Sequence, residues 1–154
     1  MDPLVFRQVI GHFASGVTII TTRERSTNYG LTASAVTSLT LEPPMLLVCI
    51  NKNTGTQAAI SRTRKFGVNI LGQEQAPLAY QFAKPQSDKF QGVDVSYGGL
   101  GVPLLTDALA RIECRVAADV EADTHRVFWA SAHRALCPTG RICRVLNSSL
   151  LVVT

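Results

Sequence analysis

The residues that could take part in chemistry gather in one run of small and hydroxyl-bearing side chains. The run Gly30-Leu31-Thr32-Ala33-Ser34-Ala35-Val36-Thr37-Ser38 would, as a β-strand, place a row of Oγ atoms along one face, because alternate residues share a face. Such a face, with backbone that a ligand can approach closely, suits a planar ring that carries a phosphate tail. A Thr- and Ser-rich edge strand without any ligand is the competing interpretation, and the run taken alone favours it.

Residues typical of nucleophilic catalysis or metal binding are not grouped in this sequence. No Ser-His-Asp or Cys-His constellation stands out, and Cys137 and Cys143 lack the CxxC pairs or nearby His of a zinc site. Cys49 and Cys114 lie in apolar or alternating runs, where free cysteine usually acts as a small buried hydrophobe. We therefore expect reduced thiols, no metal and no disulfide.

The composition indicates one folded domain, residues 1–154, and argues against nucleic-acid binding. Hydrophobic residues make up 46% of the chain, and 15 Lys and Arg stand against 11 Asp and Glu, which gives a net charge of +4. The basic residues are scattered, and the densest group, Arg62, Arg64 and Lys65, is too small to track a phosphate backbone. The positive excess is compatible with an anionic small ligand, and ordinary surface charge explains it equally well.

The apolar runs are too short for a membrane span, and we expect a cytoplasmic protein. The longest uninterrupted run, Met45–Ile50, is far shorter than the roughly 20 residues that a transmembrane helix needs. The first residues of the sequence do not show a charged segment followed by an apolar stretch, so we expect no secretory signal there.

The hydroxyl-rich run would be positioned mainly by β-strands. Asp2-Pro3 begins an amphipathic helix that we expect to end near Gly16. Val17–Thr22 is a β-branched run typical of a strand, and the alternation of Arg111–Val116 indicates a half-buried antiparallel strand. We predict further helices over residues 54–62 and 75–83, further strands over 29–41, 45–50, 66–71, 127–132 and 150–153, and a loop over 84–101. Strands without long helices between them favour a closed antiparallel barrel, mostly β with a few helices.

Several motifs occur in an order that resembles one protein family. They include Gly16-Val17-Thr18-Ile19-Ile20-Thr21-Thr22, Gly30-Leu31-Thr32-Ala33-Ser34-Ala35, Pro43-Pro44-Met45-Leu46-Leu47-Val48-Cys49-Ile50, Phe66-Gly67-Val68-Asn69-Ile70-Leu71 and Asp88-Lys89-Phe90. Each motif is weak alone, but the ordered set resembles the short-chain flavin reductases. These proteins are the reductase components of two-component flavin-dependent monooxygenases, such as those that act on phenols.

The resemblance implies both a fold and an activity. The fold would be an FMN-binding split β-barrel of antiparallel, Greek-key type, usually a homodimer with the flavin near the subunit interface. The activity would be reduction of FMN or FAD by NADH or NADPH, with reduced flavin released to a partner monooxygenase. Hydride transfer between two cofactors needs no acid or nucleophile from the protein, so we assign no catalytic residue.

The resemblance also implies which residues bind the two cofactors. Along the flavin ring and ribityl chain we expect Gly30, Leu31, Thr32, Ala33, Ser34 and Ala35. We expect Cys49, Ile50 and Asn51 at the ring edge, and Asn51, Thr54 and Thr56 toward the phosphate tail. Asp88, Lys89 and Phe90 would close the site, and His125 would lie beside the nicotinamide. Lys89 would pair with the flavin phosphate, and Arg7 is a further candidate for the nucleotide pocket. A solvated loop lysine and a structural histidine are the competing interpretations of Lys89 and His125.

Departures from the family pattern keep a second class of function open. Ala130 and Ser131 stand where the family usually has Gly-Glu, and Gly140-Arg141-Ile142 lacks the Tyr of the family's nucleotide-contacting segment. The alternative is a flavin-binding split-barrel protein without efficient NAD(P)H turnover, which would serve as a carrier or structural partner. A haem- or pyridoxal-type binder of the same fold is a third interpretation, which the motif Asp88-Lys89-Phe90 disfavours.

Overall fold

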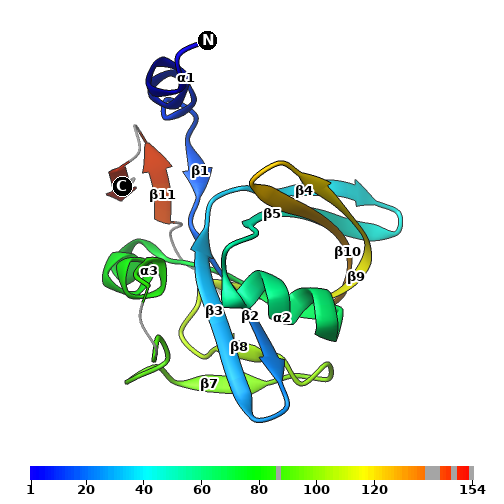
Figure 1. Cartoon of the computed structure of the whole chain (residues 1–154). Coiled ribbons are helices and arrows are strands. Elements are labelled where there is room, and N and C mark those ends of the chain that lie inside the picture. Colours follow the sequence, from blue (N-terminus) through cyan, green and yellow to red (C-terminus); the bar gives the residue numbers. More distant parts are fainter. Residues whose placement is uncertain (86–87, 138–142, 147–148, 153–154) are drawn as a thin grey trace.

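A seven-stranded antiparallel sheet curls into the wall of a barrel in the computed structural model of the chain (Figure 1). The structure describes residues 1–85, 88–137, 143–146 and 149–152, the last two segments by their backbone only. In spatial order the strands are β3 (Thr27–Ala33), β2 (Thr18–Glu24), β6 (Lys65–Ile70), β9 (Ala110–Ala122), β10 (His125–Leu136), β5 (Pro44–Asn51) and β4 (Val36–Leu41).

The barrel is split at the hydroxyl-rich run. The strands β3 and β4 follow each other in sequence but stand at opposite edges of the sheet, because β3 pairs with β2 and β4 pairs with β5. Ser34 and Ala35 cross between the edges, and the Ala35 carbonyl accepts a hydrogen bond from the Cys49 N–H at 3.0 Å. The prediction of a mostly β split barrel is confirmed. The single extended run predicted over 29–41 is corrected to two strands, because the chain changes its pairing partner at Ser34.

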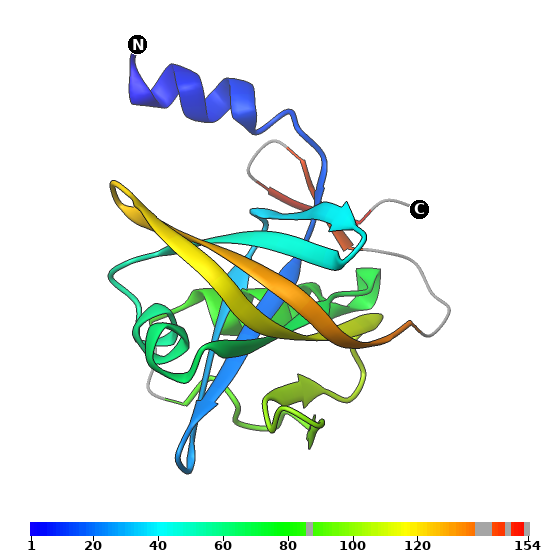
Figure 2. The same ribbon diagram turned by 90° about the vertical axis from the view of Figure 1, so that its right-hand side faces the viewer.

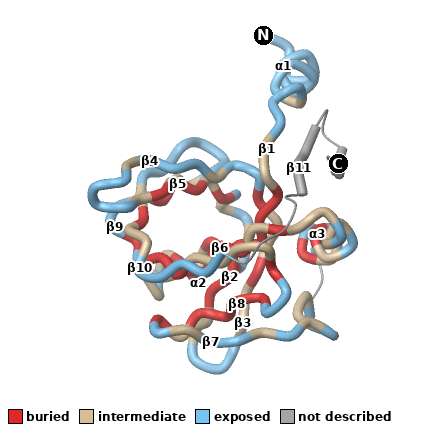
Figure 3. The backbone as a smooth tube through the Cα atoms, turned by 180° about the vertical axis from the view of Figure 1, so that it is seen from behind, coloured by how far each residue is buried: buried red, intermediate tan, exposed pale blue. Residues whose placement is uncertain are grey.

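The interior of the barrel is filled by the inward side chains of these strands. Val48, Phe66 and Phe128 are each fully buried within one cluster of apolar residues. A second cluster lies on the outer side of β2, where Ile19 packs with Phe82 of the helix α3 (Ala76–Ala83). Five consecutive residues of β2, Thr18–Thr22, are therefore buried, so the strand is covered on both faces, and Figure 3 shows this stretch of the tube in red.

The three predicted helices are present, although the first is shorter than predicted. The helix α1 (Pro3–Ile10) is capped by Asp2, whose carboxylate accepts from the Leu4 N–H at 2.7 Å. It ends at Ile10 and not near Gly16, because Ser15–Gly16 forms β1, which pairs with β11 (Cys143–Leu146). The remaining elements are α2 (Gly55–Thr63), the 3₁₀ helix η1 (Gln73–Gln75), β7 (Val95–Tyr97), β8 (Pro103–Leu105) and β12 (Ser149–Val152).

Two further predictions are corrected. The segment 84–101, predicted as a loop, contains β7, which pairs with β8 against the outside of the sheet. The strands predicted over 111–116 and 127–132 are parts of the much longer β9 and β10, which form the twisted hairpin seen in Figure 2. The extra length is mostly exposed, so burial imposes no regular hydrophobic pattern on it. No helix among the described segments is long and apolar enough to cross a bilayer.

Candidate functional site

Two adjoining cavities open beside the split of the barrel. The first has a volume of about 320 Å³ and the second of about 520 Å³. Thr54, Ala83 and Lys89 line both of them, so the two form one elongated depression. Volumes of this size are typical of sites that hold small molecules and cofactors.

The sequence-predicted residues come together around this depression. The first cavity is lined by Leu31, Thr32, Ala33, Ser34, Ala35, Cys49, Ile50, Asn51, Thr54, Lys89 and His125, and the second by Gly30, Thr54, Thr56, Lys89 and Phe90. Asp88 is the exception. Its exposed carboxylate accepts from the Phe90 N–H at 3.2 Å and shapes the turn without lining either cavity. No residue of α1 lines them either, so Arg7 is not part of the depression within one chain.

The N-terminus of α2 presents unbonded backbone N–H groups to the second cavity. The Thr54 hydroxyl caps the helix, accepting from the Gln57 N–H at 3.2 Å, and it donates to the Asn51 carbonyl at 2.9 Å. The N–H groups of Gly55 and Thr56 have no acceptor among the described residues. Such N–H groups, together with the helix dipole, suit a phosphate.

Lys89 is the only Lys or Arg among the described residues that line the two cavities. Its ammonium donates to the Phe82 carbonyl at 2.9 Å, and its own carbonyl accepts from the Gln81 amide at 2.8 Å. Burial lowers the pKa of Lys89 below its ordinary value. An anion beside the ammonium would stabilise the charged form, because opposite charges attract more strongly in a partly desolvated site.

Phe82 and Ala83 line the first cavity and were not assigned to the site from the sequence. The Phe82 ring stands edge-on to Phe90, with centroids 5.0 Å apart and an interplanar angle of 86°. A Cβ at Gly30 would lie 2.6 Å from Cε1 of Phe82 and 3.2 Å from Cζ of Phe90. The absence of a side chain at Gly30 therefore allows the rings of Phe82 and Phe90 to pack directly against the strand. In the sequence, the glycine at this position is the one signal of such close packing.

The expected row of free hydroxyls is only partly available. The Thr32 hydroxyl donates to the Ala79 carbonyl at 2.6 Å and so anchors α3 to β3. Ser34 lies in the crossing between the sheet edges and lines the first cavity, and no hydrogen bond of its side chain is recorded with a described residue. The run thus serves both the packing of α3 and the wall of the cavity.

His125 stands at the other wall of the first cavity, where the β9–β10 turn ends. Its Nδ1 lies 2.8 Å from the Thr124 hydroxyl, and its side chain is exposed. The segment that leads into α2 is tied to the same turn, since the Lys52 N–H donates to the Thr124 carbonyl at 3.0 Å. The residues 140–142, considered for nucleotide contact, lie outside the described part of the chain.

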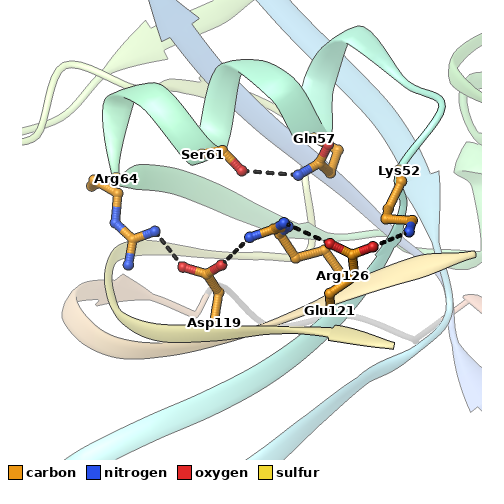
Figure 4. Close-up of polar contacts among 7 residues, drawn as sticks. All are labelled: Lys52, Gln57, Ser61, Arg64, Asp119, Glu121 and Arg126. Carbon is orange, nitrogen blue, oxygen red and sulfur yellow. Dashed lines mark hydrogen bonds and ion pairs between the residues drawn. The ribbon is translucent and has the colours of Figure 1, made fainter. Parts of the chain in front are cut away.

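A chain of alternating charges braces α2 against the β9–β10 hairpin (Figure 4). The Asp119 carboxylate lies 2.5 Å from both Arg64, at the end of α2, and Arg126. Glu121 continues the chain by pairing with Arg126 at 3.3 Å and with Lys52. Hydrogen bonding to Arg64, and then to Arg126, holds the pKa of Asp119 below its ordinary value. The network thereby links both ends of α2 to the hairpin that carries His125.

Comparison with known proteins gives consistent results. Residues 10–142 match the profile of the flavin reductase like domain. The reductase component of a 4-nitrophenol 4-monooxygenase/4-nitrocatechol 2-monooxygenase from Rhodococcus opacus is 51% identical over 91% of this chain and 75% of its own length. The solved structure of the flavin reductase PheA2 superposes with a TM-score of 0.91 at 32% identity, covering 100% of this chain and 99% of that one. An NADH:FAD oxidoreductase from Streptomyces globisporus, solved with NAD and FAD fragments, superposes with a TM-score of 0.93 at 29% identity, covering 99% and 93%.

Proposed function

The chain belongs to the flavin reductase like domain family, and on that premise we propose that it reduces FMN or FAD with NADH or NADPH. The reduced flavin would then be delivered to a partner monooxygenase. The observation that carries the proposal is the elongated depression at the barrel split, which joins an apolar and hydroxyl-lined part to an anion-binding helix end. The redox chemistry itself would be that of flavin, which takes up a hydride from a reduced nicotinamide.

The residues of the depression divide the work of holding a flavin. We assign the phosphate to the second cavity, which Gly55 and Thr56 at the N-terminus of α2 line together with Lys89. The ring is assigned to the first cavity, against the backbone of Ser34-Ala35 and of Cys49–Asn51. His125 faces the same cavity from the hairpin and is assigned to the nicotinamide. The protein's contribution is then orientation and exclusion of water.

A spectrophotometric assay tests this function. Purified protein is mixed with FMN or FAD and with NADH or NADPH, and absorbance at 340 nm is followed against free flavin. We expect nucleotide oxidation well above the free-flavin rate. Flavin binding without such turnover would refute the reductase and favour the alternative, a flavin carrier. His125→Ala should raise the nucleotide KM more than it alters flavin affinity, and the reverse pattern would move His125 to the flavin site.

We further propose that the protein acts as a homodimer. The helix α1 has no buried residue, and Figure 3 shows it in the colour of exposed residues. Its apolar side chains, such as Phe6 at 54% and Val9 at 59% exposure, are left uncovered by the residues that the structure describes. The chain also has an apolar groove of about 440 Å³ along β4 and β5, lined by residues such as Val36 and Met45. Two copies related by a two-fold axis would cover both surfaces at once.

The mass in solution tests the dimer. We expect size-exclusion chromatography with light scattering to give twice the chain mass for the wild type and a shift toward the monomer for a Phe6→Ser/Val9→Ser variant. Gln8→Ser on the same helix is the control and should leave the mass unchanged. A monomeric wild type would refute the proposal.

We also place the protein in the cytoplasm, because the proposed activity draws on NADH or NADPH. Cys49 and Cys114 are free thiols, which a reducing compartment would maintain. Fractionation of the source cells would test this placement, and recovery outside the cytoplasmic fraction would contradict it.

A further inference from the structure

A small recess outside the two cavities carries more positive charge than its surroundings neutralise. The recess has a volume of about 140 Å³ and lies between β7 and the outer face of the β9–β10 hairpin. Arg111 and Arg134 line it together with Tyr97 and Glu113, and it shares no lining residue with the two cavities of the proposed flavin site. It is therefore a separate feature of the surface.

The strand register brings the two arginines to the same face. Arg134 is paired with Glu113, and Leu136 is paired with Arg111. Because paired residues and alternate residues of a ladder project from one face, Arg111, Glu113 and Arg134 point the same way. Arg111 and Arg134 are diagonal neighbours, which places them roughly 7–8 Å apart at the level of the sheet. Two guanidinium groups can thus converge on one small ion.

Glu113 lies between the arginines in sequence and register but does not neutralise them. It is 1% exposed, and its two carboxylate oxygens accept from the N–H groups of Gly99 at 3.1 Å and Leu100 at 2.9 Å. A Cβ at Gly98 would lie 2.3 Å from the carboxyl group, so the loop passes directly against it. The carboxylate is held by this loop and could turn toward the arginines only by leaving buried N–H groups unbonded.

The arginines themselves have no partner among the described residues. The side chain of neither Arg111 nor Arg134 forms an ion pair or hydrogen bond with a described residue, and Nε of Arg111 is buried without an acceptor. Arg23, whose Nε is also buried without an acceptor among the described residues, lies over the ring of Tyr97, with Cζ 4.6 Å from the ring centroid. A buried donor without an acceptor is destabilising, so a bound anion would relieve a local cost.

We propose that this recess binds a small oxyanion, a free phosphate or the phosphate group of an ester, between Arg111 and Arg134. A guanidinium group offers a planar fork of donors that matches two oxygens of a phosphate. The volume exceeds what a single water needs and is well below that of a site for a whole cofactor. The size and the charge together select a small anion.

Isothermal titration of the full chain with inorganic phosphate, at constant ionic strength in chloride, tests the site. We expect saturable binding that weakens about tenfold or more in Arg134→Gln, because a charge-assisted hydrogen bond is lost. Arg111→Lys should weaken it as well, since a lysine keeps the charge but not the fork. Arg115→Gln is the matched control. Arg115 is an exposed arginine of β9, the strand that carries Arg111, and it does not line the recess. Binding should be unchanged there.

The titration must also separate the recess from the α2 end of the second cavity. Phosphate bound in the recess should keep its affinity in Lys89→Ala and weaken about tenfold or more in Arg134→Gln, and the opposite pattern would overturn the proposal. Equal weakening in Arg115→Gln and Arg134→Gln would overturn it too, because the effect would then be general surface charge. Repeating the titration with adenosine monophosphate identifies the source: tighter binding than inorganic phosphate indicates an ester, and weaker binding indicates free phosphate. Flavin reduction should be unchanged in Arg134→Gln.

Discussion

Gly30 is the position at which the smallest possible change should have a large effect. In Gly30→Ala the new Cβ would lie 2.6 Å and 2.8 Å from two carbons of the Phe82 ring, whereas ordinary carbon contacts are about 3.5–4.0 Å. Phe82 is fully buried and packs edge-on against Phe90, so the ring cannot turn out to solvent. The strand or α3 must therefore shift by about 1 Å.

The magnitude follows from the cost of overpacking a filled core. An added methyl group that forces such shifts typically destabilises by about 1–3 kcal/mol. For a chain of this length each kcal/mol lowers the Tm by about 2–4 °C, so Gly30→Ala should melt about 2–12 °C below the wild type in a thermal scan followed by circular dichroism. Because Phe82 and Phe90 line the depression, flavin affinity should fall in the same variant.

Two further variants show whether the clash is the cause. In Gly55→Ala the new Cβ would lie 3.6 Å from the Tyr29 ring, an ordinary contact, so its Tm should be unchanged or higher. In Gly30→Ala/Phe82→Leu the smaller side chain frees the space, and the two destabilisations should be less than additive. A Gly30→Ala protein that melts with the wild type, or strict additivity in the double variant, would refute the packing argument.

Three other predictions concern single ionisable groups. Lys89→Ala should weaken flavin binding about tenfold in a fluorescence titration, because a cation beside the phosphate is lost, while the exposed Lys84→Ala should not. The pKa of Asp119 is lowered by Arg64, so its stabilising contribution is full above the ordinary pKa of 3.8 and is lost as the pH falls through the lower folded value. The Tm of the wild type should therefore drop more steeply on acidification than that of Asp119→Asn. Burial, and then Glu113, raises the pKa of Cys114 to about 12, so iodoacetamide at pH about 8 should label it only after unfolding, as read by mass spectrometry.

Each of these has an outcome that would count against it. Unchanged flavin affinity in Lys89→Ala would leave Lys89 as a solvated loop residue. Parallel Tm curves for wild type and Asp119→Asn would mean that the carboxylate has the same pKa in the folded and unfolded states. Rapid labelling of Cys114 in the native protein would contradict its burial.

The sequence predicted strands, and residues that line the depression, where the local pattern of residues decides the structure. It failed where contacts between distant segments decide it. The β-branched run at Val17 and the alternation after Arg111 gave strands, and the Gly30–Ala35 motif marked a wall of the depression. The exchange of pairing partner at Ser34 could not be read from a continuous extended run, because both halves have the same strand propensity. The role of Phe82 depends on its contact with Gly30, which is far away in sequence.

The burial of β2 on both faces has a consequence for the unfolded chain. Its apolar and β-branched segment, Val17–Thr22, contains no charge and no proline, which is the composition of segments that stack into cross-β aggregates. In the native sheet both edges of β2 are occupied, by β3 and β6, so no other chain can add to it. The charged residues Arg23-Glu24-Arg25 directly after it act as gatekeepers while the strand is still exposed. The segment that is buried on both faces in the native sheet is thus also a candidate for cross-β association between unfolded copies.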